Sequence, residues 1–167
     1  MDSDELLTPY AVGPDEGTEE WWVRGNRFTF KAGAAEVGGG FAVVETLLYP
    51  VAAAPAHVHD ETDEAVYVIE GRLVLEVGDE RFDQAPGSFA FLPRRVPHRY
   101  LPQPPGPVRA LWLLTPAGFE NYWREIGDPV VAGQPPPKPV PPDAATMDRI
   151  GKRYRTRFLP SGADVAT

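Results

Sequence analysis

A succession of short apolar segments, each ended by a turn-forming residue, most constrains what this chain can fold into. In the segment RLVLEV, residues 72–77, Leu73, Leu75 and Val77 occupy every second position. That alternation is the pattern of a strand with one buried face. The 20 prolines and 16 glycines are spread between such segments. This punctuation favours many short strands joined by turns, as in a β-sandwich or barrel, over a bundle of helices.

Strand-like segments run through the middle of the chain without an internal repeat, so we expect one barrel. They lie at residues 21–24, 28–31, 41–49, 57–59, 65–70, 72–77, 81–82, 88–92, 98–101 and 108–114. The segment at 41–49, FAVVETLLY, is the clearest, because β-branched and aromatic residues favour strands. Gly78-Asp79 and Pro86-Gly87 mark turns.

The apolar period becomes helical after residue 114. Thr115 predicts an N-cap, and Pro116 would occupy the first helical position. An aromatic stripe then recurs at helical spacing until Gly127, formed by Phe119, Tyr122, Trp123 and Ile126. We expect this stripe to pack on the barrel rather than to bind a cofactor.

A proline-rich stretch, GQPPPKPVPP at residues 133–142, predicts an extended spacer. Asp143 then predicts the N-cap of a short second helix through Met147, Ile150 and Tyr154. The strand-like tail TRFL, residues 156–159, could return to the barrel.

The sequence therefore predicts one all-β barrel with one or two short C-terminal helices packed outside it. A chain of 167 residues can bury one good core but is too short for two ordinary domains. We expect a loosely ordered lead-in at residues 1–18 and a barrel with the first helix at residues 19–127. Residues 128–167 are expected to form the proline-rich linker and the C-terminal helix and tail.

Charge and composition exclude several classes of partner and site. A net charge of −8 argues against nucleic acids and anionic membranes, which would be repelled. The chain has no cysteine, so disulfides, thiolate metal sites and cysteine nucleophiles are excluded. The acidic N-terminus is unlike a signal peptide, and no apolar run is long enough to cross a membrane. We expect a cytoplasmic protein.

The three histidines of the chain all lie in the predicted β region. His57 and His59 are two residues apart on an extended segment, so both imidazoles should point to the same face. If residues 60–63 form the loop of a hairpin, His59 lies directly opposite Glu64 and shares its face. Spacing alone thus predicts two imidazoles and a carboxylate on one face.

Three other acidic residues compete with Glu64 in this interpretation. We prefer Glu64 because Asp60 and Glu61 lie in the loop and Asp63 points to the opposite face.

The surroundings of Glu64 indicate a cation. Val66 and Val68 should share its face, and an apolar site makes a buried carboxylate costly unless a positive charge compensates it. Spacing does not connect His98 with this group. A hydrogen-bonded core histidine remains the alternative for that residue.

Two segments resemble the motifs of the cupin family. Residues 57–71, HVHDETDEAVYVIEG, are similar to its first motif, and residues 87–98, GSFAFLPRRVPH, are similar to its second. The resemblance implies a jelly-roll barrel in which His57, His59, Glu64 and His98 hold one metal. Framework positions that usually carry glycine, glycine and asparagine are here Val51, Arg95 and Pro102. These departures affect turn geometry but remove no ligand.

A set of three imidazoles and one carboxylate suits a divalent transition metal. Iron, manganese, nickel, cobalt, copper and zinc all fit, and donor type does not choose among them. Calcium and magnesium prefer more oxygen ligands. Four protein ligands leave positions open on a metal that accepts five or six, which is typical of a catalytic site.

Segments that flank the two motifs extend the resemblance over most of residues 19–160. EEWWVRGNRFTFKAG, TPAGFENYWREIGDP and RIGKRYRTRFLP look like bacterial single-cupin proteins related to quercetin 2,3-dioxygenase. The resemblance implies cleavage of a flavonol-like or other enolisable small molecule by O2, with release of carbon monoxide and with Glu64 as the general base. Phe28, Phe30, Phe91 or Tyr100 could stack on a planar substrate, although core packing is the favoured role for each.

Two alternatives remain open. The same metal could serve as a Lewis acid in a non-oxidative isomerase or polyketide cyclase, or the barrel could bind a metal or small ligand without catalysis. In each case we expect a small-molecule ligand, no nucleic acid and no membrane. A homodimer would cover exposed edge strands.

Overall fold

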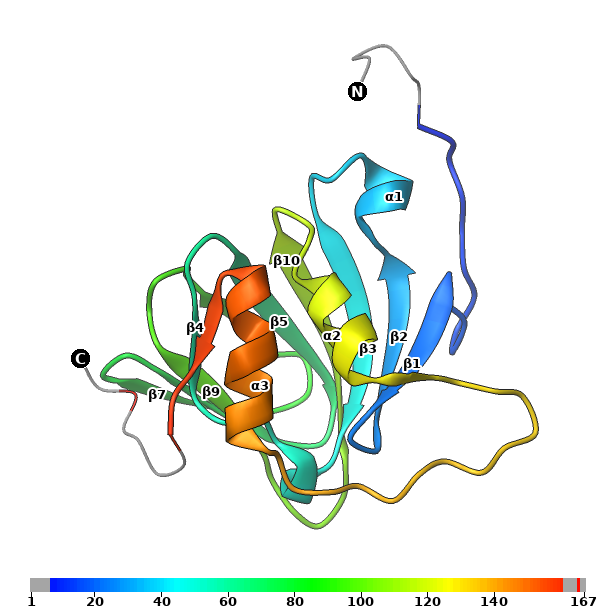
Figure 1. Ribbon diagram of the computed structural model, residues 1–167. Helices are drawn as coiled ribbons and strands as arrows, with labels where there is room; N and C mark the ends of the chain where they lie inside the picture. The colour runs from blue at the N-terminus through cyan, green and yellow to red at the C-terminus, as the bar shows by residue number, and fades with distance from the viewer. Residues whose placement is uncertain (1–6, 161–164, 166–167) are drawn as a thin grey trace.

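The computed structural model describes residues 7–160 and residue 165, and it forms two antiparallel sheets packed face to face (Figure 1). The larger sheet has the order β11-β1-β2-β3-β10-β5-β8, and the smaller has the order β12-β4-β9-β6-β7. Strands of the larger sheet are β1 (Glu19–Val23), β2 (Asn26–Ala32), β3 (Ala42–Leu48), β5 (Asp63–Glu70), β8 (Phe89–Leu92), β10 (Val108–Thr115) and β11 (Asp128–Pro129). Strands of the smaller sheet are β4 (His57–His59), β6 (Leu73–Val77), β7 (Glu80–Gln84), β9 (His98–Pro102) and β12 (Thr156–Phe158).

Helical segments are few and short. They are α1 (Ala34–Val37), α2 (Glu120–Ile126), α3 (Ala144–Gly151) and the 3₁₀ turns at Pro50–Ala52 and Lys152–Tyr154. The prediction of an all-β jelly-roll barrel with short helices outside it is confirmed. In the part of the chain that the structure describes, no helix is long and apolar enough to span a membrane.

The core lies between the sheets and follows the period of two that the sequence shows. On β3, Ala42, Val44, Thr46 and Leu48 are buried, and the residues between them are partly exposed. On β6, the alternating residues Leu73 and Leu75 are fully buried. These inward-facing rows contact the inward-facing rows of the opposite sheet. The polar residues of the candidate site therefore lie in an otherwise apolar interior.

The helix α2 begins later than the sequence predicts. Thr115 is still part of β10, where it pairs with Asp63, and its hydroxyl donates to the carbonyl of Gly40 at 3.1 Å. It therefore cannot cap a helix, and α2 begins at Glu120. The predicted packing of the aromatic stripe is confirmed, because Phe119, Tyr122, Trp123 and Ile126 all contact the core.

A buried carboxylate joins α2 to α1, a short helix that the sequence analysis missed. Glu120 is fully buried, and its Oε1 accepts from the backbone N–H of Ala34 at 3.0 Å. Its other oxygen accepts from the N–H of Gly118. Glu120 thus satisfies backbone donors at both turns that lead into these helices.

The C-terminal segment folds back onto the barrel. As predicted, Asp143 caps α3, accepting from the N–H groups of Ala145 at 3.2 Å and Thr146 at 3.3 Å. Helix α3 lies beside α2 and buries Met147 and Ile150 against the same apolar cluster (Figure 1). The predicted tail is a strand, β12, which pairs with β4 and covers its edge.

The predicted N-terminal lead-in and C-terminal tail lie partly outside the described residues. Of residues 1–18, the structure describes residues 7–18, which form no helix or strand. Tyr10 nevertheless donates to the carbonyl of Lys31 at 2.6 Å. The end of the predicted range 128–167 also falls on residues that are not described.

Removing the cap of α3 should destabilise the C-terminal segment. We expect Asp143→Ala to lower the Tm by roughly 2–4 °C, because two N–H groups of the first turn lose their acceptor. Thermal unfolding followed by circular dichroism measures the change. Asp79→Ala is the matched control, since Asp79 is exposed in a turn and makes no side-chain hydrogen bond among the described residues. An equal Tm for both variants would contradict the capping role.

Candidate metal centre

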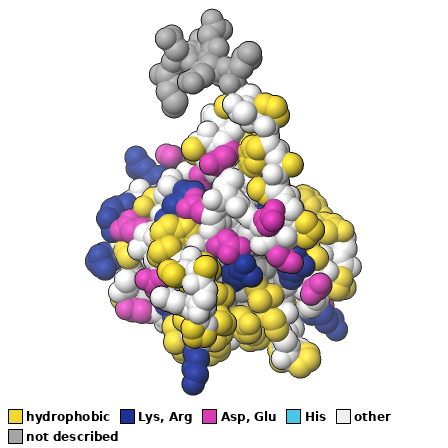
Figure 2. All heavy atoms as spheres, turned by 90° about the vertical axis from the view of Figure 1, so that its right-hand side faces the viewer, with side chains coloured by type: hydrophobic (Ala, Val, Ile, Leu, Met, Phe, Trp, Pro, Cys, Tyr) yellow, Lys and Arg dark blue, Asp and Glu magenta, His cyan; other side chains and the backbone are white. Residues whose placement is uncertain are grey.

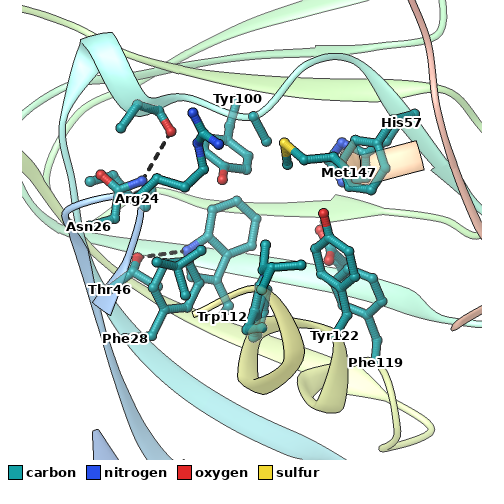
Figure 3. A pocket seen from close by; sticks show the side chains of 18 residues that line it. Arg24, Asn26, Phe28, Thr46, His57, Tyr100, Trp112, Phe119, Tyr122 and Met147 are labelled. Carbon is teal, nitrogen blue, oxygen red and sulfur yellow. Dashed lines mark hydrogen bonds between the residues drawn. The ribbon is translucent and has the colours of Figure 1, made fainter. Parts of the chain in front are cut away.

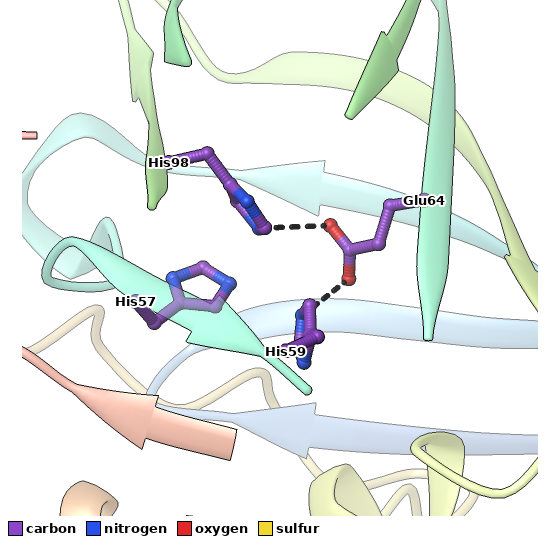
Figure 4. Close-up of side chains that lie close together, drawn as sticks. All are labelled: His57, His59, Glu64 and His98. Carbon is purple, nitrogen blue, oxygen red and sulfur yellow. Dashed lines mark hydrogen bonds and ion pairs between the residues drawn. The ribbon is translucent and has the colours of Figure 1, made fainter. Parts of the chain in front are cut away.

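The structure brings the four predicted ligand residues together in the barrel interior. One potential ligand atom from each of His57, His59, Glu64 and His98 lies within 4.8 Å of the others (Figure 4). Their exposed fractions are 4%, 1%, 3% and 0% respectively. No histidine is visible on the face of the molecule in Figure 2, where acidic, basic and apolar side chains mix. The cluster is therefore an interior feature.

The two sheets contribute unequally to the cluster. The smaller sheet supplies all three histidines, with His57 on β4 paired directly with His98 on β9. The larger sheet supplies Glu64 near the start of β5. Because β4 pairs with β9 and β12, and β5 pairs with β8 and β10, the hairpin predicted between His59 and Glu64 is wrong. Residues 60–62 instead cross between the sheets, so Glu64 faces His59 across the core.

The structure also separates Glu64 from its acidic competitors. Val66 and Val68 are buried on the inward face that Glu64 shares, as the alternation predicts. Asp63 faces outward and accepts from the guanidinium of Arg94 at 2.7 Å. Asp60 and Glu61 remain in the connecting loop outside the cluster.

Hydrogen bonds at Nδ1 determine which nitrogen of each imidazole faces the centre. The Nδ1 of His57 lies 3.0 Å from the carbonyl of Pro55, and that of His98 lies 2.9 Å from the carbonyl of Val96. A carbonyl can only accept, so both Nδ1 atoms carry hydrogen. Both Nε2 atoms therefore present lone pairs, as metal ligands do.

His59 has a partner on the C-terminal strand. Its Nδ1 lies 2.6 Å from the hydroxyl of Thr156 on β12. That hydroxyl donates to the carbonyl of Tyr154 at 3.1 Å, so it can accept from His59. The Nε2 of His59 is then left as a lone pair like the other two.

These lone pairs face a carboxylate. Glu64 Oε1 lies 3.0 Å from His59 Nε2, and Glu64 Oε2 lies 3.6 Å from His98 Nε2. His98 Nε2 is buried and makes no hydrogen bond. Acceptors that converge in an apolar interior repel one another unless a cation lies between them. The donor set thus fits a divalent transition metal, which His57, His59, His98 and Glu64 could hold.

The electrostatics of the metal-free cluster agree with this fit. Burial lowers the pKa of His57 well below its usual value, and the neighbouring His98 and His59 lower it further. Burial alone would raise the pKa of Glu64, but positive charge on the side of His59 and His98 outweighs burial and holds that pKa well below its usual value. In the metal-free cluster this charge is hydrogen at Nε2, whose place a metal would take. Both groups are therefore in the forms that bind a metal, neutral imidazole and ionised carboxylate.

A narrow, mainly apolar cavity opens onto one side of the cluster. His57 and Glu64 line it, whereas His59 and His98 do not, so an open metal position would face this space (Figure 3). Its volume is only about 30 Å³. Other lining residues include Arg24, Asn26, Phe28, Thr46, Tyr100, Trp112, Phe119, Tyr122, Trp123, Met147 and Phe158.

Sequence reasoning found only part of this lining. Of the aromatic residues considered for substrate stacking, Phe28 and Tyr100 line the cavity. Phe30 is buried in the core against Trp123, and Phe91 is 54% exposed on the outside, so neither does. Arg24, Tyr122 and Thr156 were missed as site residues. Helical spacing predicted an inward-facing Tyr122, but nothing in the pattern indicated that its hydroxyl would reach a cavity.

Comparison with known proteins agrees with this geometry. Residues 44–114 match the family described as the cupin domain. The curated quercetin 2,3-dioxygenase of Bacillus subtilis (strain 168) is 28% identical over 130 residues, which is 77% of this chain. The chain spans 38% of the length of that relative.

Solved structures share the fold at low sequence identity. An RmlC-like cupin from Shewanella frigidimarina aligns with a TM-score of 0.57 and 16% identity, covering 70% of this chain and 99% of that one. The polyketide cyclase RemF from Streptomyces resistomycificus aligns with a TM-score of 0.55 and 21% identity, covering 65% of this chain and 80% of that one. These likenesses show the jelly-roll fold.

The hydroxyl of Thr156 should matter for metal affinity although it is not a ligand. Thr156→Val keeps the shape of the side chain but removes the acceptor that orients His59, so we expect a roughly 10–100-fold weaker affinity for zinc. Competition with a chelating dye measures the affinity. Thr29→Val, which alters a buried threonine on β2, is the control and should bind zinc like the wild type. Equal affinities in all three proteins would show that the Thr156 contact does not position the ligand.

The depressed pKa values predict that acid destabilises the metal-free protein. As the pH falls below about 6.5, the unfolded chain takes up a proton at His57 that the folded chain does not, so stability falls. Glu64 adds to the loss below about pH 4.5, because its folded pKa is also the lower one. Thermal unfolding between pH 8 and pH 4 should show a falling Tm, with a smaller fall for His57→Gln. A Tm that rises on acidification would contradict the assigned directions.

Proposed function

We propose that this chain, of which residues 44–114 match the cupin domain family, is a metal-dependent enzyme that oxidises a small enolisable molecule with O2. The observation that carries the proposal is the position of two cluster residues, His57 and Glu64, on the wall of a partly open, mainly apolar cavity. A structural site would be enclosed by protein on every side, but His57 and Glu64 border open space.

The residues of this chain have distinct roles in the proposed reaction. The cluster would hold a divalent metal, which would act as a Lewis acid towards a substrate hydroxyl and lower its pKa. Glu64 is ionised and borders the cavity, so it can accept that hydroxyl proton as general base. Its two oxygens lie 3.0 Å from Nε2 of His59 and 3.6 Å from Nε2 of His98, so a metal shared with these two residues would fix the position of the carboxylate.

The cavity walls are suited to protect an electron-rich, reactive intermediate from water. Phe28, Trp112 and Phe119 border the space and exclude water, which protects an enolate from protonation by solvent. Aromatic walls also suit a planar ring. The similarity to quercetin 2,3-dioxygenase supports oxygen as the second substrate.

The size of the cavity favours a small substrate. Sites for drug-sized ligands usually have volumes of about 300–1,000 Å³. A cavity of about 30 Å³ admits a multi-ring flavonol only if the side chains on α2 and α3 move. We therefore propose a flavonol-like or simpler enol whose reacting end, at least, is a single ring.

A non-oxidative isomerase or cyclase is the second candidate. It is favoured by the ionised, cavity-facing state of Glu64, because a carboxylate base can enolise a substrate without oxygen. Oxygen dependence separates the two candidates.

The test follows metal content, oxygen uptake and substrate loss together. Metal in the purified protein is measured by mass spectrometry, and the loaded protein is given quercetin and acetylacetone in air and under argon. We expect turnover only in air, with oxygen consumed in step with substrate. Conversion under argon would favour the isomerase or cyclase. Bound metal with no turnover of any enol would leave a binding protein.

A pair of glutamate variants tests the proposed base. Glu64→Gln keeps the size of the side chain but cannot take a proton, so we expect turnover to fall by roughly 10²–10⁴-fold in protein matched for metal content. Glu61→Gln is the control, because Glu61 is exposed in the neighbouring loop and should keep full activity. Full activity of metal-loaded Glu64→Gln would exclude this base.

A further inference from the structure

An arginine occupies a position where the backbone disfavours it. Val23 pairs with Asn26, so Arg24 and Gly25 form the two-residue turn between β1 and β2. Their φ angles are 59° and 83°, both in the left-handed region. Two-residue turns of this kind prefer asparagine followed by glycine, and a residue such as arginine is uncommon at a positive φ. A strained residue of this kind suggests that its side chain has a function.

The side chain of Arg24 reaches the cavity that borders the candidate metal centre. Its Nη2 donates to the carbonyl of Val140 at 3.1 Å, and its backbone carbonyl accepts from the N–H of Val140 at 3.0 Å. The proline-rich segment thus holds the guanidinium in place. In Figure 3, Arg24 and His57 lie on opposite sides of the cavity.

The guanidinium is incompletely paired: Asp143 attracts it electrostatically but forms no ion pair with it. Among the described residues Arg24 forms no ion pair, and its Nε is buried without a hydrogen-bond acceptor. Burial also lowers the pKa of Arg24 from its usual value. Arg24 as a whole is partly buried, and its buried Nε has lost hydration that a ligand with an acceptor atom would replace.

A second donor in the cavity is also unsatisfied. Tyr122 is 1% exposed, and its hydroxyl is buried without a hydrogen-bond partner. Burial raises its pKa, so the hydroxyl keeps its proton and can donate. Figure 3 shows this hydroxyl pointing into the cavity.

Two other polar residues on the cavity wall, Asn26 and Thr46, already have hydrogen-bond partners. Asn26 donates to the carbonyl of Ala52 at 3.1 Å and accepts from the N–H of Tyr49 at 2.8 Å. The hydroxyl of Thr46 accepts from the indole of Trp112 at 3.0 Å. On this wall the buried atoms without a partner are Nε of Arg24 and the hydroxyl of Tyr122, both of which can donate to a negatively charged acceptor.

We propose that Arg24 and Tyr122 bind a carboxylate of the substrate, at the end opposite to the enol that faces His57 and Glu64. A guanidinium and a hydroxyl that converge on one space match the acceptor geometry of a carboxylate. The substrate class is then a small enolisable carboxylic acid. This assignment rests on the proposed function only for the orientation of the enol.

The position of Arg24 also marks the route into the cavity. Arg24, Ile126 and Met147 line both the inner cavity and an outer depression of about 270 Å³ between α2 and α3. These shared side chains lie between the two spaces, so a ligand that enters from the depression passes all three.

The acidic residues of that depression are largely engaged. Asp143 caps α3, and Glu125 pairs with Arg153 and accepts from the hydroxyl of Tyr154 at 2.7 Å. Their charges are thus partly compensated, which reduces the repulsion that an entering anion would meet.

Two hydroxypyrones provide a matched pair of probes. Kojic acid and comenate share the metal-chelating hydroxyketone, but kojic acid carries a hydroxymethyl group where comenate carries a carboxylate. Both are titrated calorimetrically into the zinc-loaded protein, because zinc supports no redox turnover. We expect comenate to bind at least about 10-fold more tightly, since hydrogen bonds to a charged group contribute that much or more.

Three variants test which side chain causes the preference for comenate over kojic acid. Arg24→Asn suits the left-handed turn, so we expect it to keep the wild-type Tm or exceed it and to bind both probes with equal, kojic-acid-like affinity. Tyr122→Phe should lose part of the preference for comenate. Arg27→Met is the control, because Arg27 pairs with Glu20 at 2.6 Å outside the cavity and should keep the full preference.

Equal affinity of the wild type for both probes would overturn the proposal, as would a preference for comenate that survives in Arg24→Asn. Failure of the proposed function would be seen separately. Either zinc would not bind, or kojic acid would bind His59→Ala as tightly as it binds the wild type. If zinc does not bind, the same pair titrated into the metal-free protein still tests Arg24, and a comenate preference lost in Arg24→Asn would support its role.

Discussion

The convergence of a buried carboxylate with three imidazole nitrogens is the constraint on which the rest of the structure depends. Each imidazole is turned by a hydrogen bond at Nδ1, to Pro55, to Val96 or to Thr156. With these partners the Nε2 lone pairs and Glu64 cannot satisfy one another. A cation converts this repulsion into a coordination site. The return of β12 to the edge of β4 therefore matters for the site, because it brings the hydroxyl that orients His59.

The cavity beside this cluster has one end suited to a cation and another end suited to an anion. At one end, the acceptor atoms of His57 and Glu64 favour binding of a cation. At the other, the donors of Arg24 and Tyr122 call for an anion. Apolar and aromatic side chains lie between them, where unpaired charge would be costly. A ligand that carries an oxygen donor for the metal at one end and a carboxylate at the other would satisfy both ends.

Most of the fold and part of the site could be predicted from the sequence, because both rest on local periodicity. Alternation located the strands, and the two-residue spacing placed His57 and His59 on one face. His98 required the family resemblance, since its pairing with His57 joins strands far apart in the sequence. The predicted hairpin failed because loop length does not reveal whether a chain turns back or crosses to another sheet. Thr156 and Arg24 contact segments that are far away in the sequence. No local sequence pattern indicates such contacts.

The proposed function requires one metal ion at the cluster of His57, His59, Glu64 and His98 in the barrel. The most direct measurement is a crystal structure of the zinc-loaded protein with diffraction collected at the zinc absorption edge. We expect one anomalous peak at bonding distance, about 2.0–2.2 Å, from Nε2 of His57, His59 and His98 and from an oxygen of Glu64. A zinc ion bound elsewhere, or coordinated through any Nδ1 of these histidines, would contradict the account.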